Sequence, residues 1–136
     1  MQKKKFFITT AIDYVNARPH IGHAFEKIIA DAIARWHKLK GEDVWFLTGT
    51  DENAQKNARV AKEEGVDVQK FVDRNSKIFI ELCEVLDVDY DRFIRTTEEE
   101  HKQKAQEIFK KVYDKGEIYK GKYEGLYCVG CEEYKT

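Results

Sequence analysis

The chain has 136 residues, with 24 Lys and Arg against 25 Asp and Glu, and a formal net charge of −1. Hydrophobic residues make up 42% and charged residues 36%, a balance typical of a globular domain and not of a disordered tail. The near-neutral charge provides no global field for binding nucleic acid. No segment approaches the ~20 apolar residues of a membrane span, so we expect a cytoplasmic protein that has no membrane partner.

The first fifty residues alternate between strand and helix patterns. Residues 5–11 are rich in aromatic and β-branched side chains, which predicts a buried strand. Residues 21–40 have helical spacing of apolar side chains and precede Gly41, and residues 44–47 form a second apolar run. A strand–helix–strand unit of this length implies parallel pairing through a right-handed crossover. The apolar positions that predict the helix are Ala24, Ile28, Ala32 and Trp36.

The remainder of the chain continues with predicted helices and short extended segments. Asp67 can cap a helix whose apolar stripe runs from 68 to 86 and includes Cys83, which we interpret as a small core residue. Thr97 followed by Glu100 has the spacing of a capping box. The other predicted elements are a helix at 53–64, a strand at 92–94, a helix that ends at Gly116, and a hairpin at 117–127.

Two histidines lie at the junction between the first predicted strand and the long predicted helix. In open parallel sheets, ligands bind at the carboxyl ends of strands, and the next helix N-terminus attracts phosphate. His20 and His23 are three residues apart and project to the same side of a helical turn, and Gly22 would let a ligand approach the backbone. The alternatives are two surface histidines at a helix start or a pair of metal ligands.

Four segments together carry a resemblance to a known family. YVNARPHIGHA at 14–24 resembles the signature of class I aminoacyl-tRNA synthetases, in particular those for methionine and related aliphatic amino acids. FLTGTDE at 46–52, FIRTT at 93–97 and YEGLYCVGCE at 123–132 are similar to later segments of the methionine-specific enzymes. The similarity covers essentially the whole chain.

The resemblance implies a fold and a domain organisation. We expect an α/β chain that forms the N-terminal half of a Rossmann-like nucleotide-binding fold, with parallel strands and helices. Residues 1–116 would be the first half of the catalytic domain, and residues 117–136 would be the incomplete start of a connective insertion with a zinc knuckle. The second class I signature, KMSKS, is absent, since the only methionine is Met1.

The resemblance also implies an activity, in which methionine is activated with ATP and magnesium and the methionyl group is transferred to tRNA(Met). His20 and His23 match the residues that contact ATP and stabilise charge on its phosphates, and Gly22 matches a position beside the adenosine. Ala11, Ile12, Tyr14 and Asp51 match positions that bind methionine.

The role of Asp51 has a structural alternative, because the same residue could cap the helix at 53–64. In the family match, its carboxylate holds the substrate ammonium. Two departures from the family pattern lie nearby. Asp13 stands where an apolar, aromatic or proline residue is commoner, and Asn53 with Ala54 replaces the more usual His-Gly.

Cys128 and Cys131 are separated by two residues, in the manner of half a zinc knuckle. A structural zinc ion needs four ligands, so the other two would come from the remainder of the enzyme or from a partner chain. Free surface thiols are the alternative. We expect the isolated chain to be inactive. A non-catalytic domain that binds adenine nucleotide or RNA is the rival function, and a related nucleotidyltransferase is a weaker one.

Overall fold

The computed structural model describes residues 3–135. They form two compact units, one ending at Lys102 and the other beginning at Gln103. The first unit contains a parallel sheet of three strands in the order β1-β2-β3. Its elements are β1 (Lys5–Tyr14), α1 (Ile21–Leu39), β2 (Asp43–Asp51), α2 (Gln55–Glu63), α3 (Val68–Val85) and β3 (Arg92–Arg95), followed by the start of α4 (Glu99–Asp114).

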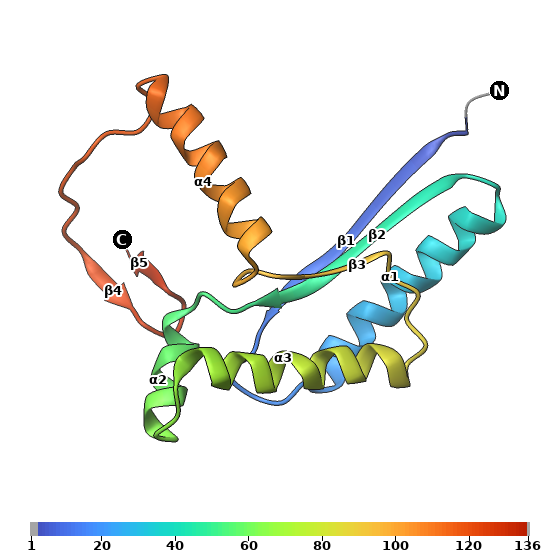
Figure 1. The fold of residues 1–136 in the computed structure, drawn as a ribbon, viewed down its shortest axis with the longest axis horizontal. Helices are drawn as coiled ribbons and strands as arrows, with labels where there is room; N and C mark the ends of the chain where they lie inside the picture. The colour runs from blue at the N-terminus through green and yellow to red at the C-terminus, as the bar shows by residue number, and fades with distance from the viewer. Residues whose placement is uncertain (1–2, 136) are drawn as a thin grey trace. The chain divides into compact units, whose positions relative to one another are not determined.

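This connectivity confirms the predicted α/β fold. Helix α1 connects β1 to its neighbour β2, and helices α2 and α3 connect β2 to β3. Figure 1 shows α1 and α3 on the same side of the sheet. Because all three strands are parallel, their carboxyl ends meet at one edge of the sheet, which is where ligands bind in folds of this kind.

The core lies between the sheet and the two long helices. Phe46 on β2 and Phe71, Val72 and Phe79 on α3 are almost completely buried there. Cys83 also lies in this core and is fully buried, as predicted. Burial raises the pKa of its thiol, because the apolar surroundings disfavour the thiolate.

Helix α1 presents a different face to the core from the one its large side chains predict. The buried positions are Ala24, Lys27, Ala30 and Ala34, whereas Ile28 and Trp36 are 47% and 55% exposed. Small side chains therefore allow the helix to approach the sheet closely. The helix predicted from Ala24, Ile28, Ala32 and Trp36 is confirmed, although only Ala24 of these four residues is buried.

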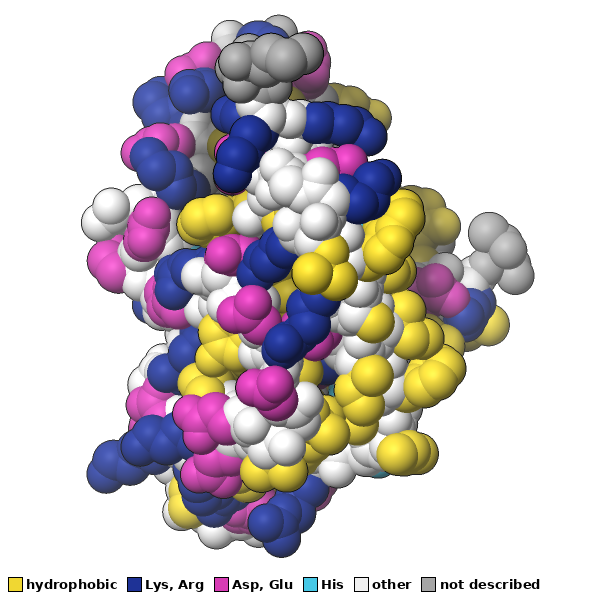
Figure 2. Space-filling model, turned by 90° about the vertical axis from the view of Figure 1, so that its right-hand side faces the viewer, with side chains coloured by type: hydrophobic (Ala, Val, Ile, Leu, Met, Phe, Trp, Pro, Cys, Tyr) yellow, Lys and Arg dark blue, Asp and Glu magenta, His cyan; other side chains and the backbone are white. Residues whose placement is uncertain are grey.

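Large apolar side chains remain exposed on α1 and on the sheet. Ile21, Phe25 and Leu39 on α1 are all more than half exposed, as are Phe7 on β1 and Trp45 on β2. The side of the molecule in Figure 2 exposes many hydrophobic side chains between the charged ones. Parallel sheets are usually covered on both faces, so this surface has the character of an interior that a larger protein would bury.

The second unit contains a short antiparallel hairpin of β4 (Leu126–Cys128) and β5 (Glu133–Lys135). Tyr127 lies opposite Tyr134, and the rings of Tyr123 and Tyr127 both pack against the Tyr134 ring. The predicted hairpin at 117–127 is therefore wrong, because residues 117–125 form no strand and the hairpin is built around the cysteine pair. No helix among residues 3–135 is long and apolar enough to cross a membrane.

Candidate active site at the carboxyl edge of the sheet

The two histidines form the N-terminal cap of α1. His20 is the N-cap residue, and its Nδ1 accepts a hydrogen bond from the backbone N–H of Gly22 at 3.1 Å. The backbone N–H of His20 donates in turn to Nδ1 of His23 at 3.0 Å. The two ring centroids are 3.9 Å apart. This is a reciprocal capping box, with imidazole nitrogens in the place of the usual hydroxyl and carboxylate oxygens.

The capping geometry determines the tautomer of both rings. A backbone N–H can only donate, so each Nδ1 is an unprotonated acceptor, and the ring proton of the neutral form is on Nε2. Burial lowers the pKa of His23, with Lys27 and His20 acting in the same direction and Asp13 opposing them. His23 is therefore a neutral donor at neutral pH, at a helix terminus whose dipole favours anions.

Gly22 is required by the cap itself. A Cβ atom at this position would lie 2.9 Å from Cε1 of the His20 ring, a separation that would push the ring away from its hydrogen bond. The structure thus gives Gly22 a role in seating His20. The closer approach of a ligand to its backbone stays a prediction.

The carboxyl ends of the strands bring the sequence-separated residues together. Asp13 pairs in register with Thr50, and Tyr14 pairs with Asp51. The side chain of Asp13 is buried and lies 3.8 Å from Nε2 of His23 and 2.6 Å from Nζ of Lys27. The first turn of α1 and the ends of β1 and β2 therefore form one continuous site.

Asp51 does not cap α2, so the prediction of a helix cap is wrong and the binding role stays a prediction. The N-cap of α2 is Ala54, and no side chain caps it. Oδ1 of Asp51 instead accepts hydrogen bonds from the backbone of Asn53 at 3.2 Å and from the hydroxyl of Thr96 at 3.5 Å. The half-buried carboxylate is thereby held at the strand edge.

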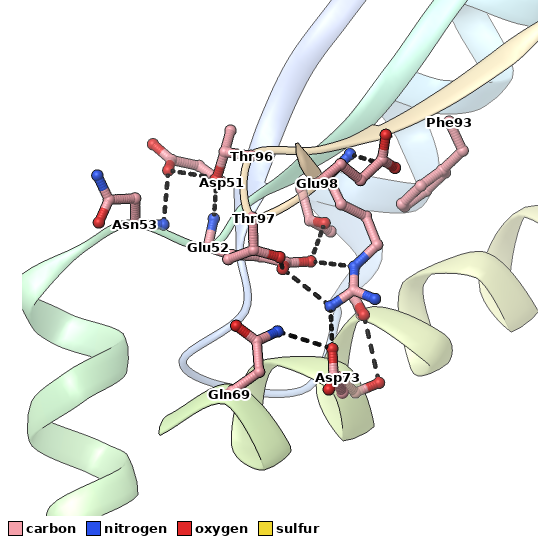
Figure 3. Close-up of polar contacts among 12 residues, drawn as sticks. Asp51, Glu52, Asn53, Gln69, Asp73, Phe93, Thr96, Thr97 and Glu98 are labelled. Atoms are coloured by element: carbon pink, nitrogen blue, oxygen red, sulfur yellow. Dashed lines mark hydrogen bonds and ion pairs between the residues drawn. The ribbon is translucent and has the colours of Figure 1, made fainter. Parts of the chain in front are cut away.

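Glu52, next to Asp51, is the centre of a network that the sequence did not indicate (Figure 3). Its side chain is fully buried, and its carboxylate accepts from Nε and Nη2 of Arg95 at 2.7 and 2.9 Å. The hydroxyl of Thr50 donates to it at 2.8 Å, and the hydroxyl of Thr97 donates as well. The network ties the end of β2 to the end of β3.

Arg95 continues this network to α3. Its guanidinium also pairs with Asp73 at 2.5 Å, and the three hydrogen bonds that it makes to two carboxylates raise its pKa. The same contact, with help from Gln69, lowers the pKa of Asp73. The predicted helix cap at Thr97 is wrong, because α4 begins at Glu99 and the hydroxyl of Thr97 donates to Glu52.

The proposed methionine-binding segment of β1 contains a bulge. The register with β2 shifts between Thr9 and Ile12, and the backbone N–H of Ala11 donates to Oε1 of Glu26 on α1 at 2.8 Å. Ile12 and Tyr14 remain 39% and 38% exposed. A bulge at this point re-aims the side chains at the end of a strand.

The cysteine pair lies in the second unit. Cys128 ends β4, and its Sγ accepts a hydrogen bond from the backbone N–H of Cys131 at 3.4 Å. Two thiols that share a tight turn fit half of a tetrahedral zinc site. No group of three or more His, Cys, Asp or Glu side chains that could hold a metal ion occurs among residues 3–135, so a zinc site at Cys128 and Cys131 stays a prediction.

Comparison with known proteins identifies the family. The sequence profile of the tRNA synthetases class I (M) matches residues 6–136. The chain belongs to this family of class I tRNA synthetases. It is 50% identical over 133 residues to the methionine–tRNA ligase of Streptomyces coelicolor, covering 97% of this chain and 25% of the relative. It is 52% identical over 134 residues to that of Deinococcus radiodurans, covering 98% of this chain and 20% of the relative.

A solved structure of the same family supports the fold. The Mycobacterium tuberculosis methionyl-tRNA synthetase in complex with methionyl-adenylate superposes with a TM-score of 0.94 at 44% identity. The match covers 97% of this chain and 26% of that chain. The chain therefore spans about a quarter of the length of the synthetases that it matches.

Proposed function

We propose that this chain supplies the ATP- and methionine-binding part of a methionine–tRNA ligase. The observation that carries the proposal is the cap at the N-terminus of α1, in which Nδ1 of His20 and Nδ1 of His23 accept from the backbone, so that the ring proton of each is on Nε2. This cap lies beside the strand ends that hold Asp51. The supporting comparisons are the synthetase profile over residues 6–136 and the complex of the Mycobacterium tuberculosis relative with methionyl-adenylate.

The reaction begins with attack of the methionine carboxylate on the α-phosphate of ATP, and pyrophosphate leaves. Catalysis of this step depends on positioning and on stabilising the charge that develops on the phosphate oxygens. The Nε2–H groups of His20 and His23 would donate to those oxygens, and the dipole of α1 would add to the effect. Magnesium would accompany ATP as part of the co-substrate.

Asp51 would hold the ammonium group of methionine. Its carboxylate is anchored by Asn53 and Thr96 and lies in register with Tyr14. A thioether has no strong hydrogen-bonding group, so its recognition would depend on shape. The part of the pocket that receives the thioether would be lined by Ala11, Ile12 and Tyr14, which lie at and after the bulge of β1. The adenylate would then pass its methionyl group to tRNA(Met), in the cytoplasm.

The remainder of the enzyme is proposed to cover the exposed apolar side chains of α1 and of the sheet. It would also supply the KMSKS signature and, directly or through a partner chain, the other two zinc ligands. On this proposal, the isolated chain gives little or no methionine-dependent ATP–pyrophosphate exchange. Robust exchange by residues 1–136 alone would show that the missing part is dispensable.

The histidine role is tested by His23→Ala in the full-length synthetase that contains this chain. Loss of one phosphate donor is expected to cost about 2–4 kcal/mol in kcat/KM for exchange. His101→Ala on α4 is the matched control, since His101 lies outside the proposed site. An exchange rate that His23→Ala leaves unchanged would remove the phosphate role.

Ligand titration separates the enzyme from the rival function. Methionine that tightens the binding of ATP supports a shared active site. Binding of ATP or RNA that is indifferent to methionine would instead indicate a non-catalytic nucleotide- or RNA-binding domain.

A further inference from the structure

A buried ion pair lies beneath the first turns of α1. Lys27 is fully buried, and its Nζ lies 2.6 Å from Oδ2 of Asp13, which is 6% exposed. Among residues 3–135, neither Nζ of Lys27 nor Oδ2 of Asp13 has a hydrogen-bond partner, so the contact is an ion pair. Lysine and aspartate are almost never buried to this degree unless they are paired. The proposed reaction assigns neither of them a role.

The ion pair is in direct contact with the proposed ATP site. One oxygen of the Asp13 carboxylate faces Lys27, and the other lies 3.8 Å from Nε2 of His23. The opposite ring nitrogen of His23 accepts from the backbone of His20, and the edge-to-face ring of Phe79 on α3 packs at a centroid distance of 5.4 Å. The imidazole is therefore held by β1, by the helix cap and by α3.

We propose that Asp13 and Lys27 are positioning residues that set the orientation and the charge of the His23 imidazole toward the phosphates of ATP. The proposal rests on the phosphate-binding role of His23. Asp13 keeps the Nε2 proton of His23 directed to the strand edge. Lys27 neutralises Asp13, so that an unpaired carboxylate does not repel the incoming phosphates.

The charges around His23 are consistent with this division of roles. Asp13 on β1 and Glu26 on α1 favour the protonated ring, whereas Lys27 and His20 disfavour it. On α3, burial raises the pKa of the Cys83 thiol, on which Lys27 and Asp13 act in opposite directions. Since burial, with His20 and Lys27, outweighs the two carboxylates, the pKa of His23 is lowered and the ring stays a neutral donor.

The first test is a pH titration of the histidine Cε1 protons by NMR in residues 1–136. Asp13→Asn is expected to lower the apparent pKa of His23, because Lys27 is then uncompensated. Lys27→Met is expected to raise it, because Asp13 is then uncompensated. Lys38→Met is the matched control, since it breaks the exposed pair with Asp89 farther along the same helix and should leave His23 unchanged. An unchanged His23 in both site variants would overturn the proposal.

The double variant Asp13→Asn with Lys27→Met removes both buried charges and keeps side chains of similar size. It therefore tests the positioning role even if a single variant fails to fold. In the full-length synthetase, we expect it to melt near the wild-type temperature. Its kcat for methionine-dependent ATP–pyrophosphate exchange should fall about 10- to 100-fold, with a smaller change in KM for ATP. Wild-type kcat in a folded double variant would overturn the positioning role.

These outcomes are distinguishable from failure of the proposed function. If the wild-type full-length synthetase shows no methionine-dependent exchange, the proposed function fails, and the NMR titration still decides whether Asp13 and Lys27 control His23.

Discussion

The Glu52–Arg95 pair provides a quantitative test of how the strand ends are held. Glu52→Gln keeps the shape of the side chain but removes the charge that accepts from Nε and Nη2 of Arg95. Breaking a buried pair by neutralising one partner costs about 3–5 kcal/mol. The lower end applies here, because the Arg95 side chain is 25% exposed and keeps its contact with Asp73. We therefore expect a loss of about 3 kcal/mol.

Urea unfolding followed by tryptophan fluorescence measures this loss. For a domain of about 100 residues, it corresponds to a fall in Tm of about 12 °C or more. Glu63→Gln is the matched control, because its pair with Arg59 has a separation of 3.8 Å and both side chains are more than 60% exposed. The control should change stability by less than about 0.5 kcal/mol.

A double-mutant cycle separates the pair from its surroundings. If the two groups interact directly, Glu52→Gln costs much less once Arg95 is replaced by methionine. A cost of less than about 1 kcal/mol for Glu52→Gln alone would refute a stabilising Glu52–Arg95 pair. The same cost with and without Arg95 would also refute it.

Three further predictions concern the same unit. Gly49→Ala should destabilise the protein in urea by more than about 3 kcal/mol, because the new Cβ would lie 2.1 Å from the carbonyl oxygen of Ile94; a smaller loss would mean that β2 and β3 can separate there. Asn75→Ala should cost about 1–3 kcal/mol, since it removes a 2.6 Å hydrogen bond to the buried carbonyl of Val15; no loss in urea would contradict this. Because burial lowers the pKa of His23, the unfolded chain binds more protons, so Tm should fall as the pH drops below about 6.5; a His23→Gln variant with the same pH slope would count against it.

The order of the elements could be predicted from the sequence because it depends on local patterns. The strands at β1, β2 and β3 and the helices between them were all expected close to their observed bounds. Hydrophobic periodicity, glycine stops such as Gly41 with its φ of +79°, and the parallel connection rule are sufficient for that. The sequence likewise predicts that His20 and His23 lie at the start of α1.

Contacts between distant segments could not be predicted in this way. The buried Asp13–Lys27 pair and the Glu52–Arg95 network join residues 14 and 43 positions apart. In the sequence, Asp13 is notable only as a departure from the family pattern. Nothing in the residues around Lys27 indicates that it is buried or that it pairs with Asp13. The buried face of α1 could not be predicted for the same reason, since periodicity cannot show which of two apolar faces packs against the sheet.

The sequence by itself therefore determined the family, the alternation of strands and helices, and the position of His20 and His23 at a helix start. Only the tertiary structure decided the state of those histidines. Their tautomer follows from backbone donors within the cap. The pKa of His23 is lowered by its burial, while Asp13 on β1 and Lys27 on α1 act on it in opposite directions. Hydrophobic patterning is local and readable along the chain, whereas electrostatic balance in a buried site is a sum over groups that only folding brings together.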